Sequence, residues 1–164
     1  EEAGYKVVHK GENFEIRYYE ERIVIQTRYD SGNSGFRKLF NYISGQNQGE
    51  KKIEMTTPVT EVQDDNQMVM QFYLPARFNA ASAPLPADNS LEIATIDAGY
   101  FAVIQYSGFA SNKNFYKHAQ ILKSSLDRDN IEISSQPIKA TYDGPFTLPN
   151  LRRNEAMYLV LWDN

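Results

Sequence analysis

The sequence predicts an α+β fold made of two pseudo-symmetric βαββ repeats, which form a distorted, largely antiparallel barrel or curved sheet with two helices. Three observations lead to this class. Runs rich in β-branched and aromatic residues alternate with turn residues along the 164-residue chain. Two segments show the apolar period of a helix, and about half the chain separates them. The order strand–strand–helix–strand–strand occurs on both sides of a segment with linker composition at 76–90.

The first predicted half spans about 13–75. Its helix follows a turn cluster at 30–35 and ends at Gly45. Apolar residues at the spacing i, i+3, i+4 and i+7 predict one buried helix face, consisting of Phe36, Leu39, Phe40 and Ile43. The β-branched and aromatic runs predict strands at about 14–19, 22–29, 53–62 and 67–74.

The strand predicted over 53–62 contains a proline in its middle. Pro58 cannot donate a ladder hydrogen bond, so it interrupts a segment in which apolar residues otherwise alternate. Met55 lies just before it. A methionine here favours the role of a flexible gap-filler in the core. The alternative is a contact with a flat ring or a thioether ligand.

The second predicted half spans about 91–163 and repeats the order of the first. Ser111 is the predicted N-cap of its helix. The apolar face of this helix consists of Phe115, Ala119, Leu122 and Leu126. Strands are predicted at about 91–96, 100–106, 138–142 and 156–162. Both halves together form a single domain over 1–164.

Composition excludes several classes of function. The net charge is −4, whereas a protein that grips the nucleic-acid backbone normally has a basic excess, so we expect no nucleic-acid partner. The sequence contains no run of eighteen apolar residues, so we expect no membrane span. The absence of cysteine excludes disulfides and thiolate catalysis. With only two histidines, a transition-metal site made entirely by protein is not expected.

The candidate chemical residues each have a structural alternative. His118 lies beside the apolar face of the second helix, where a packed histidine is favoured over a metal ligand. Tyr18 ends the first strand, and packing is favoured over tyrosinate ligation of ferric iron. Arg152 and Arg153 at a loop edge are either solvated or bind carboxylates through paired hydrogen bonds. No nucleophile elbow, phosphate loop or zinc-protease motif occurs, so the protein is predicted not to be an enzyme.

The first residue is Glu1 rather than Met, which suggests a processed chain. We therefore expect a periplasmic or secreted protein, with a cytoplasmic location as the alternative. The sequence carries no prediction of oligomeric state.

Several segments together resemble the SOUL/heme-binding protein family. The most specific is Met55-Thr56-Thr57-Pro58-Val59, within a match over 52–60. The other matching segments occur in family order at 14–19, 42–47, 72–75, 142–145 and 152–155. The Glu-Glu start before a Tyr-x-Val strand is similar to exported bacterial members. This resemblance implies the duplicated βαββ fold and the binding of heme or related tetrapyrroles, without a common reaction.

The resemblance also implies a site, an apolar cleft by the first helix and the 143–149 loop. Some family members have a histidine proposed as axial heme ligand at the position of Tyr18, which leaves tyrosinate, or no protein ligand at all, for this chain. Phe40 stands where relatives have methionine and Asn41 where they have lysine, which leaves the propionates to arginine or to Lys38. The predicted ligand-binding residues, with Met55 added as a ring contact, are Arg37, Phe40, Asn41, Ser44, Met55, Phe146, Thr147, Leu148, Arg152 and Arg153.

The predicted function is therefore a heme or tetrapyrrole carrier, buffer or scavenger. The first alternative is a non-heme module that binds an effector or another flat hydrophobic ligand on the same fold. The second is an enzyme that acts on tetrapyrroles or another small ligand.

Overall fold

The computed structural model describes residues 1–30 and 34–163, and the chain divides into two units. Unit 1 comprises Glu1–Ala3 and Glu21–Asp97, whereas unit 2 comprises Gly4–Glu20 and Ala98–Asn164. Of the predicted turn at 30–35, residues 31–33 lie outside the described part of the chain. Among the described residues, no helix has both the length and the apolar character needed to cross a bilayer.

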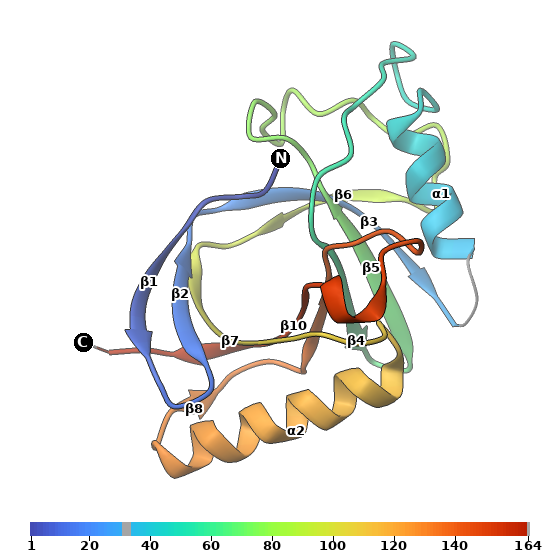
Figure 1. Ribbon diagram of the computed structural model, residues 1–164. Coiled ribbons are helices and arrows are strands. Elements are labelled where there is room, and N and C mark those ends of the chain that lie inside the picture. Colours follow the sequence, from blue (N-terminus) through green and yellow to red (C-terminus); the bar gives the residue numbers. More distant parts are fainter. Residues whose placement is uncertain (31–33, 164) are drawn as a thin grey trace. The chain divides into compact units, whose positions relative to one another are not determined.

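The described residues of unit 1 form a four-stranded antiparallel sheet with α1 packed on it. The strand order is β4–β5–β3–β6, and α1 packs against β3 and β5 (Figure 1). The elements are β3 (Arg22–Tyr29), α1 (Ser34–Ile43), β4 (Val59–Asp64), β5 (Gln67–Tyr73) and β6 (Glu92–Ile96).

The core of unit 1 lies between α1 and the sheet. Leu39 and Tyr42 of the helix are fully buried there. The Tyr42 hydroxyl donates to the Pro84 carbonyl at 2.5 Å, and burial raises the pKa of Tyr42 to about 12. After the helix, the buried Asn47 side chain donates to the Tyr42 and Lys51 carbonyls and accepts from the Lys51 amide. These bonds hold the turn that leads out of α1.

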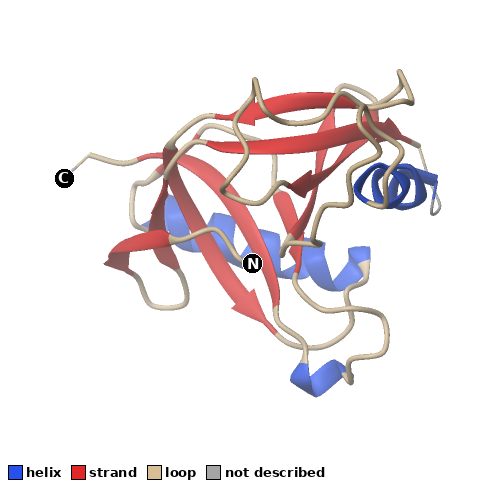
Figure 2. Cartoon of the chain, turned by 90° about the horizontal axis from the view of Figure 1, so that it is seen from above, coloured by secondary structure: helices blue, strands red, loops and turns tan. Residues whose placement is uncertain are grey.

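Unit 2 is a second antiparallel sheet, and α2 covers one face of it (Figures 1 and 2). The strand order is β1–β2–β7–β10–β9, and β8 also pairs with β10. The elements are β1 (Tyr5–Lys10), β2 (Glu15–Tyr19), β7 (Gly99–Tyr106), α2 (Asn112–Arg128), β8 (Glu132–Ile133), β9 (Ile138–Thr141), the short 3-10 helix η1 (Pro149–Leu151) and β10 (Asn154–Leu161).

The long helix α2 forms as the sequence predicts. The Ser111 hydroxyl accepts from the Asn114 amide at 3.1 Å, which satisfies one of the free donors at the helix start. The predicted apolar face of this helix is confirmed, because all four of its residues are buried against the sheet. Burial of this face is what attaches the helix to β7 and β10.

The predicted α+β class, with antiparallel strands and two helices, is confirmed. The strand predicted over 53–62 is wrong in its first part. It begins at Val59, directly after Pro58, because proline has no N–H to donate to a ladder. The buried face of α1 is also partly wrong, since Phe36 and Phe40 are 42% and 48% exposed, whereas the unpredicted Tyr42 is buried.

The connectivity around the two helices is the same in both units. In unit 1, β3 pairs with β5 and β5 with β4. In unit 2, β7 pairs with β10 and β10 with β9. The first strand of each predicted half lies in the sheet of the other half. β2, from the first half, pairs with β7 in unit 2, and β6, from the second half, pairs with β3 in unit 1. Each predicted half thus contributes its first strand to the unit of the other, and the internal duplication stays a prediction.

Candidate ligand-binding surfaces

The outer side of α1 carries a flat aromatic surface. Phe36 and Phe40 lie one helical turn apart, and their rings stack with centroids 6.1 Å apart and planes within 13°. Phe36 also meets the ring of Phe72 on β5 edge-on, at 5.2 Å. The stacked pair, called the aromatic shelf below, is held from beneath by the sheet and leaves about half of its ring surface exposed.

The predicted residues of this helix surround the shelf. Positions 37, 40, 41 and 44 follow the i, i+3, i+4, i+7 spacing and therefore share one side of the helix end. Arg37 is exposed, as is Ser44, and Asn41 is half-buried. Lys38 donates from Nζ to Ser90 Oγ at 3.2 Å. The shelf thus combines apolar rings with a neighbouring guanidinium, which suits a flat apolar molecule that carries carboxylates.

Met55 does not fill a gap in the core, as was favoured from sequence. It is 41% exposed, whereas Thr56 beside it is buried and donates its hydroxyl to the Tyr73 carbonyl. The reason is local. The segment before Pro58 is not part of the β4 ladder, so the alternation of a strand does not set which side chains turn inward.

In unit 2, the loop between β9 and β10 exposes apolar side chains. Phe146 is 97% exposed, Leu148 and Leu151 are also exposed, and Thr147 is half-buried between the first two. Figure 2 shows the short η1 helix of this loop standing beyond the strands of its unit. Large apolar groups at a loop tip are normally buried or bound to a partner, so this surface is a second candidate.

Arg152 and Arg153 support that loop from within unit 2. The Arg152 guanidinium donates to three carbonyls of the loop, those of Asp143, Gly144 and Thr147. The Arg153 amide donates to the Asp143 carboxylate at 2.6 Å, and its guanidinium lies over the Tyr142 ring at 3.8 Å. Both side chains therefore have internal partners, and a role in binding ligand carboxylates stays a prediction.

A buried ion pair lies beneath this region. Arg17 on β2 and Glu155 on β10 form two parallel hydrogen bonds of 2.8 Å, and both side chains are at most 3% exposed. Arg153 and Tyr142 donate to the same carboxylate. Burial alone would raise the pKa of Glu155, but the hydrogen bonds and charge of Arg17 outweigh it and lower that pKa. Burial likewise opposes the charge of Arg17, but the hydrogen bonds that it donates to Glu155 and the negative charge of that carboxylate raise the pKa of Arg17.

The hydroxyl of Tyr142 is the neutral member of this cluster. Burial and the adjacent negative charge of Glu155 raise the pKa of Tyr142 well above its ordinary value. The phenol therefore stays protonated and donates to Glu155 at 2.7 Å. Together these groups tie β2 to β10 across β7, around a carboxylate that remains charged.

Tyr18, the candidate axial ligand, is half-buried on β2, and its ring lies 5.1 Å from that of Tyr100 on β7. Tyr19, the next residue, is buried on the opposite face of the strand, in keeping with the alternation of side chains along β2. Tyr100 contacts Tyr18 and also lines a hollow in unit 2.

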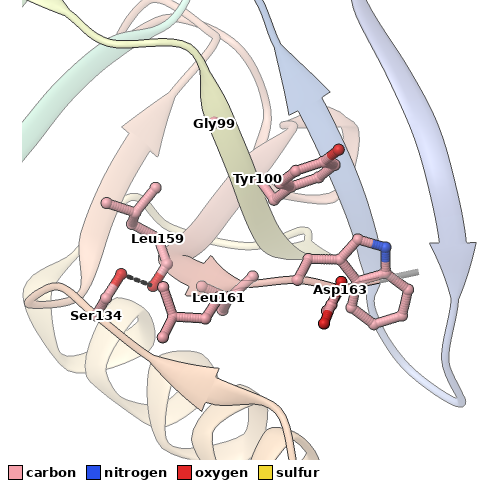
Figure 3. Close-up of a pocket in the computed structure, with 8 residues that line it drawn as sticks. Gly99, Tyr100, Ser134, Leu159, Leu161 and Asp163 are labelled. Atoms are coloured by element: carbon pink, nitrogen blue, oxygen red, sulfur yellow. Dashed lines mark hydrogen bonds between the residues drawn. The ribbon is translucent and has the colours of Figure 1, made fainter.

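That hollow has a volume of about 320 Å³, at the low end of the roughly 300–1,000 Å³ typical of small-molecule sites. Figure 3 shows Tyr100, Leu159 and Leu161 around it, with the Asp163 carboxylate at its edge and Ser134 bonded to the Leu159 carbonyl. The remaining lining residues are Gly99, Val160 and Trp162. Its walls are apolar and aromatic, and among the described residues that line it Asp163 alone carries a charge.

The two histidines have structural partners. The His118 ring stacks on Tyr106 at 4.0 Å with planes within 3°, and its Nδ1 lies 2.8 Å from the Asn114 carbonyl. His9 is half-buried, because its ring packs at 4.8 Å against Trp162. Over residues 1–30 and 34–163, no group of three or more His, Cys, Asp or Glu residues is placed to hold a metal ion.

Sequence reasoning missed three parts of these surfaces. The sequence pattern assigned Phe36 to the core. A helix that carries aromatic residues on two of its sides cannot bury all of them against one sheet. The hollow at Tyr100 and Trp162 gave no signal, because its lining residues come from separate strands and a chain end. The partner of Glu155 lies 138 residues away in sequence, a distance at which no local pattern operates.

Comparison with known proteins identifies the family. The model of the SOUL heme-binding protein family matches residues 1–159. The chain belongs to the SOUL heme-binding protein family. It is 28% identical to heme-binding protein 1 of Xenopus laevis over 172 residues, which cover 94% of this chain and 89% of that protein. It is 26% identical to heme-binding protein 2 of Homo sapiens over 163 residues, which cover 90% and 78%. The resemblance predicted from the sequence motifs is confirmed.

Several solved structures share the fold with this SOUL family member. The C-terminal domain of EcmrR has a TM-score of 0.64 at 16% identity and covers 96% of this chain and 98% of that chain. A hydrolase from Listeria innocua has a TM-score of 0.65 at 7% identity, with 94% of each chain covered. SAV2435 bound to tetraphenylphosphonium has a TM-score of 0.52 at 10% identity, with 90% and 93% covered. At these identities the likeness concerns the fold alone.

Proposed function

We propose that this SOUL family member binds heme or a related tetrapyrrole, as a carrier, buffer or scavenger, and that the aromatic shelf of α1 receives the ring. Family membership and the heme-binding names of both relatives support tetrapyrrole binding. The observation that carries the choice of surface is the stacked pair Phe36 and Phe40, whose half-exposed rings lie parallel within 13°.

The chemistry of the shelf fits such a ligand. A porphyrin has two flat apolar faces and propionate groups on its edge. The apolar face is removed from water on the shelf, at about 25 cal/mol per Å² before ordering costs. Arg37, exposed on the same side of the helix, is in place to donate paired hydrogen bonds to a propionate. Exposure of the two phenylalanine rings to water is unfavourable, and this unfavourable free energy is removed when the porphyrin ring covers them.

The test is a hemin titration followed by the Soret band. Phe40→Ala is expected to weaken binding about tenfold, because it removes most of the burial gained by one aromatic side chain. Tyr116→Ala is the matched control, since Tyr116 is 50% exposed on α2 and Phe40 is 48% exposed on α1. Arg37→Gln is expected to weaken hemin more than a porphyrin ester that lacks free propionates. Equal affinity of Phe40→Ala and wild type would exclude the shelf.

The remaining predicted contacts are tested in the same assay. Tyr18 of unit 2 is the alternative position for the ring: if its tyrosinate ligates the ferric iron, Tyr18→Phe should abolish the Soret shift, whereas Phe40→Ala should leave it unchanged. Leu148→Ala and Met55→Ala test the loop and the extended segment. Hemin affinity that is unchanged in a variant removes that residue from the site. Arg152→Met is expected to act differently, by loosening the loop whose three carbonyls it holds.

A second candidate function is the binding of a small hydrophobic cation in the hollow of unit 2. The observation in its favour is the lining of Tyr100, Leu159 and Trp162 with Asp163 as the charged group, which suits an organic cation through cation–π contact and charge. Trp162 is the only tryptophan of the chain, so its fluorescence reports on this hollow. Saturable quenching by tetraphenylphosphonium that is lost in Asp163→Asn would support it, and non-saturating quenching would exclude it.

We propose that binding, rather than turnover, is the activity of this chain. Heme incubated with the protein and a reductant should keep its porphyrin spectrum, and a ring-opened product would assign an enzymatic role instead. The periplasmic or secreted location predicted from the sequence stays a prediction, which fractionation of the source cells checks.

A further inference from the structure

The apolar tip of unit 2 is larger than the loop predicted from sequence. Gly108 donates its amide to the Pro149 carbonyl at 2.8 Å, and its own carbonyl accepts from Asn154 Nδ2 at 3.0 Å. These bonds join the β7–α2 connection to the β9–β10 loop. The connection presents Phe109, which is 70% exposed, next to a loop that exposes three further large apolar residues. The tip is defined here as Phe109, Phe146, Leu148 and Leu151.

This tip is presented by a braced scaffold. Arg152 holds the carbonyls of the β9–β10 loop, and the Asn114 side chain donates to the Phe109 carbonyl at 2.9 Å. Gly108 has a φ of +96°, and a Cβ there would lie 3.1 Å from Asn114 Nδ2, so glycine permits this close turn. The exposed side chains thus stand on backbone whose position is fixed by side-chain bonds, and no core residue has to move for them to meet a partner.

A basic surround, made of Lys113, Lys117 and Lys139, lies at the start of α2 beside Phe109 of the tip. Lys113 and Lys117 are exposed on the first turns of α2, and Lys139 reaches the same helix start through a bond from its Nζ to Asn112 Oδ1 at 3.2 Å. The chain has no Asp or Glu over 98–126. Over 133–154 the only acidic residue is Asp143, whose carboxylate accepts from the Arg153 amide. This basic surround contrasts with the net charge of −4 of the whole chain.

From these observations we propose that the tip docks onto the surface of an anionic lipid bilayer. The four apolar side chains enter the boundary between head groups and acyl chains, and the lysines contact the phosphates. Tyr116, half-exposed on the same turns of α2, suits the interfacial layer because its ring is apolar and its hydroxyl polar. A protein partner is the less favoured occupant, because the basic surround lies on two separate elements, α2 and β9.

The proposal is independent of the aromatic shelf of α1, so its test uses no residue of that shelf. The wild-type protein is mixed with vesicles of equal parts phosphatidylcholine and phosphatidylglycerol, and the bound fraction is measured by flotation. The double variant Phe109→Ser/Leu151→Ser should lose at least about tenfold in partition, because two side chains no longer leave water. Leu85→Ser is the matched control, since Leu85 in unit 1 is 61% exposed and Leu151 is 68% exposed.

Charge is tested separately with Lys113→Glu/Lys117→Glu, which should bind the anionic vesicles less well. Wild-type binding should also weaken as salt rises from about 0.1 to 1 M, because the Debye length falls from about 10 to 3 Å. Circular dichroism confirms the fold of each variant. Three results would each overturn the proposal: no flotation of wild type, equal flotation of wild type and the Phe109/Leu151 variant, or self-association in solution that this variant abolishes.

Discussion

The ion pair between Arg17 and Glu155 allows a sharp prediction of stability. Replacing Arg17 by Met removes the guanidinium that holds the carboxylate in two bonds of 2.8 Å. Breaking a buried pair from one side typically costs roughly 3–5 kcal/mol, because an uncompensated charge stays buried. Arg153 and Tyr142 still donate to Glu155 in the variant. We therefore expect about 3 kcal/mol of lost stability at neutral pH, the lower end of that range.

The pH dependence follows from the lowered pKa of Glu155. In the wild type, its stabilising contribution is complete above the ordinary value of 4.5 and is lost as the pH falls through the lowered pKa of the folded state. In Arg17→Met, burial dominates and the carboxyl takes up a proton more readily. The difference in unfolding free energy between wild type and variant should therefore shrink as the pH falls, first through the raised pKa of Glu155 in the variant and then through its lowered pKa in the wild type.

Urea unfolding followed by circular dichroism measures both quantities. The double variant Arg17→Met/Glu155→Leu completes the cycle, since replacing both partners by apolar groups is often close to neutral. It should be more stable than Arg17→Met alone. A cost below about 1 kcal/mol for Arg17→Met, a cost independent of pH, or additive effects in the double variant would refute the reasoning.

Three further predictions concern the scaffold. Ser111→Ala should cost about 1 kcal/mol of unfolding free energy, because the α2 N-cap bond is lost; an unchanged urea midpoint would show that the cap is not formed in solution. Leu122→Ala should cost roughly 2–5 kcal/mol because the side chain is fully buried, whereas Ile121→Ala, 37% exposed beside it, should cost far less; equal costs would place the helix face wrongly. Asn47→Ala should cost about 1–3 kcal/mol and speed proteolysis after α1, since two carbonyls and an amide lose their partner; unaltered proteolysis would contradict this role.

Part of the aromatic shelf could be predicted from the sequence. The helix, its end at Gly45 and the common side of Arg37, Phe40, Asn41 and Ser44 follow from a period of 3.6 residues, and all are visible in the sequence. The exposure of Phe36 is not, because it depends on where the sheet beneath the helix ends. The same holds for Met55, whose direction changes because Pro58 delays the start of β4 until Val59.

The sequence by itself determined the local elements and the family. The N-cap at Ser111, the apolar face of α2 and the motif around Pro58 are properties of neighbouring residues, which the chain carries in any environment. Tertiary structure alone decided which groups meet across long separations, such as Arg17 with Glu155, and which first strand joins which sheet. The physical reason is that burial and strand register act between segments far apart in the chain, whereas capping and periodicity act within a few residues.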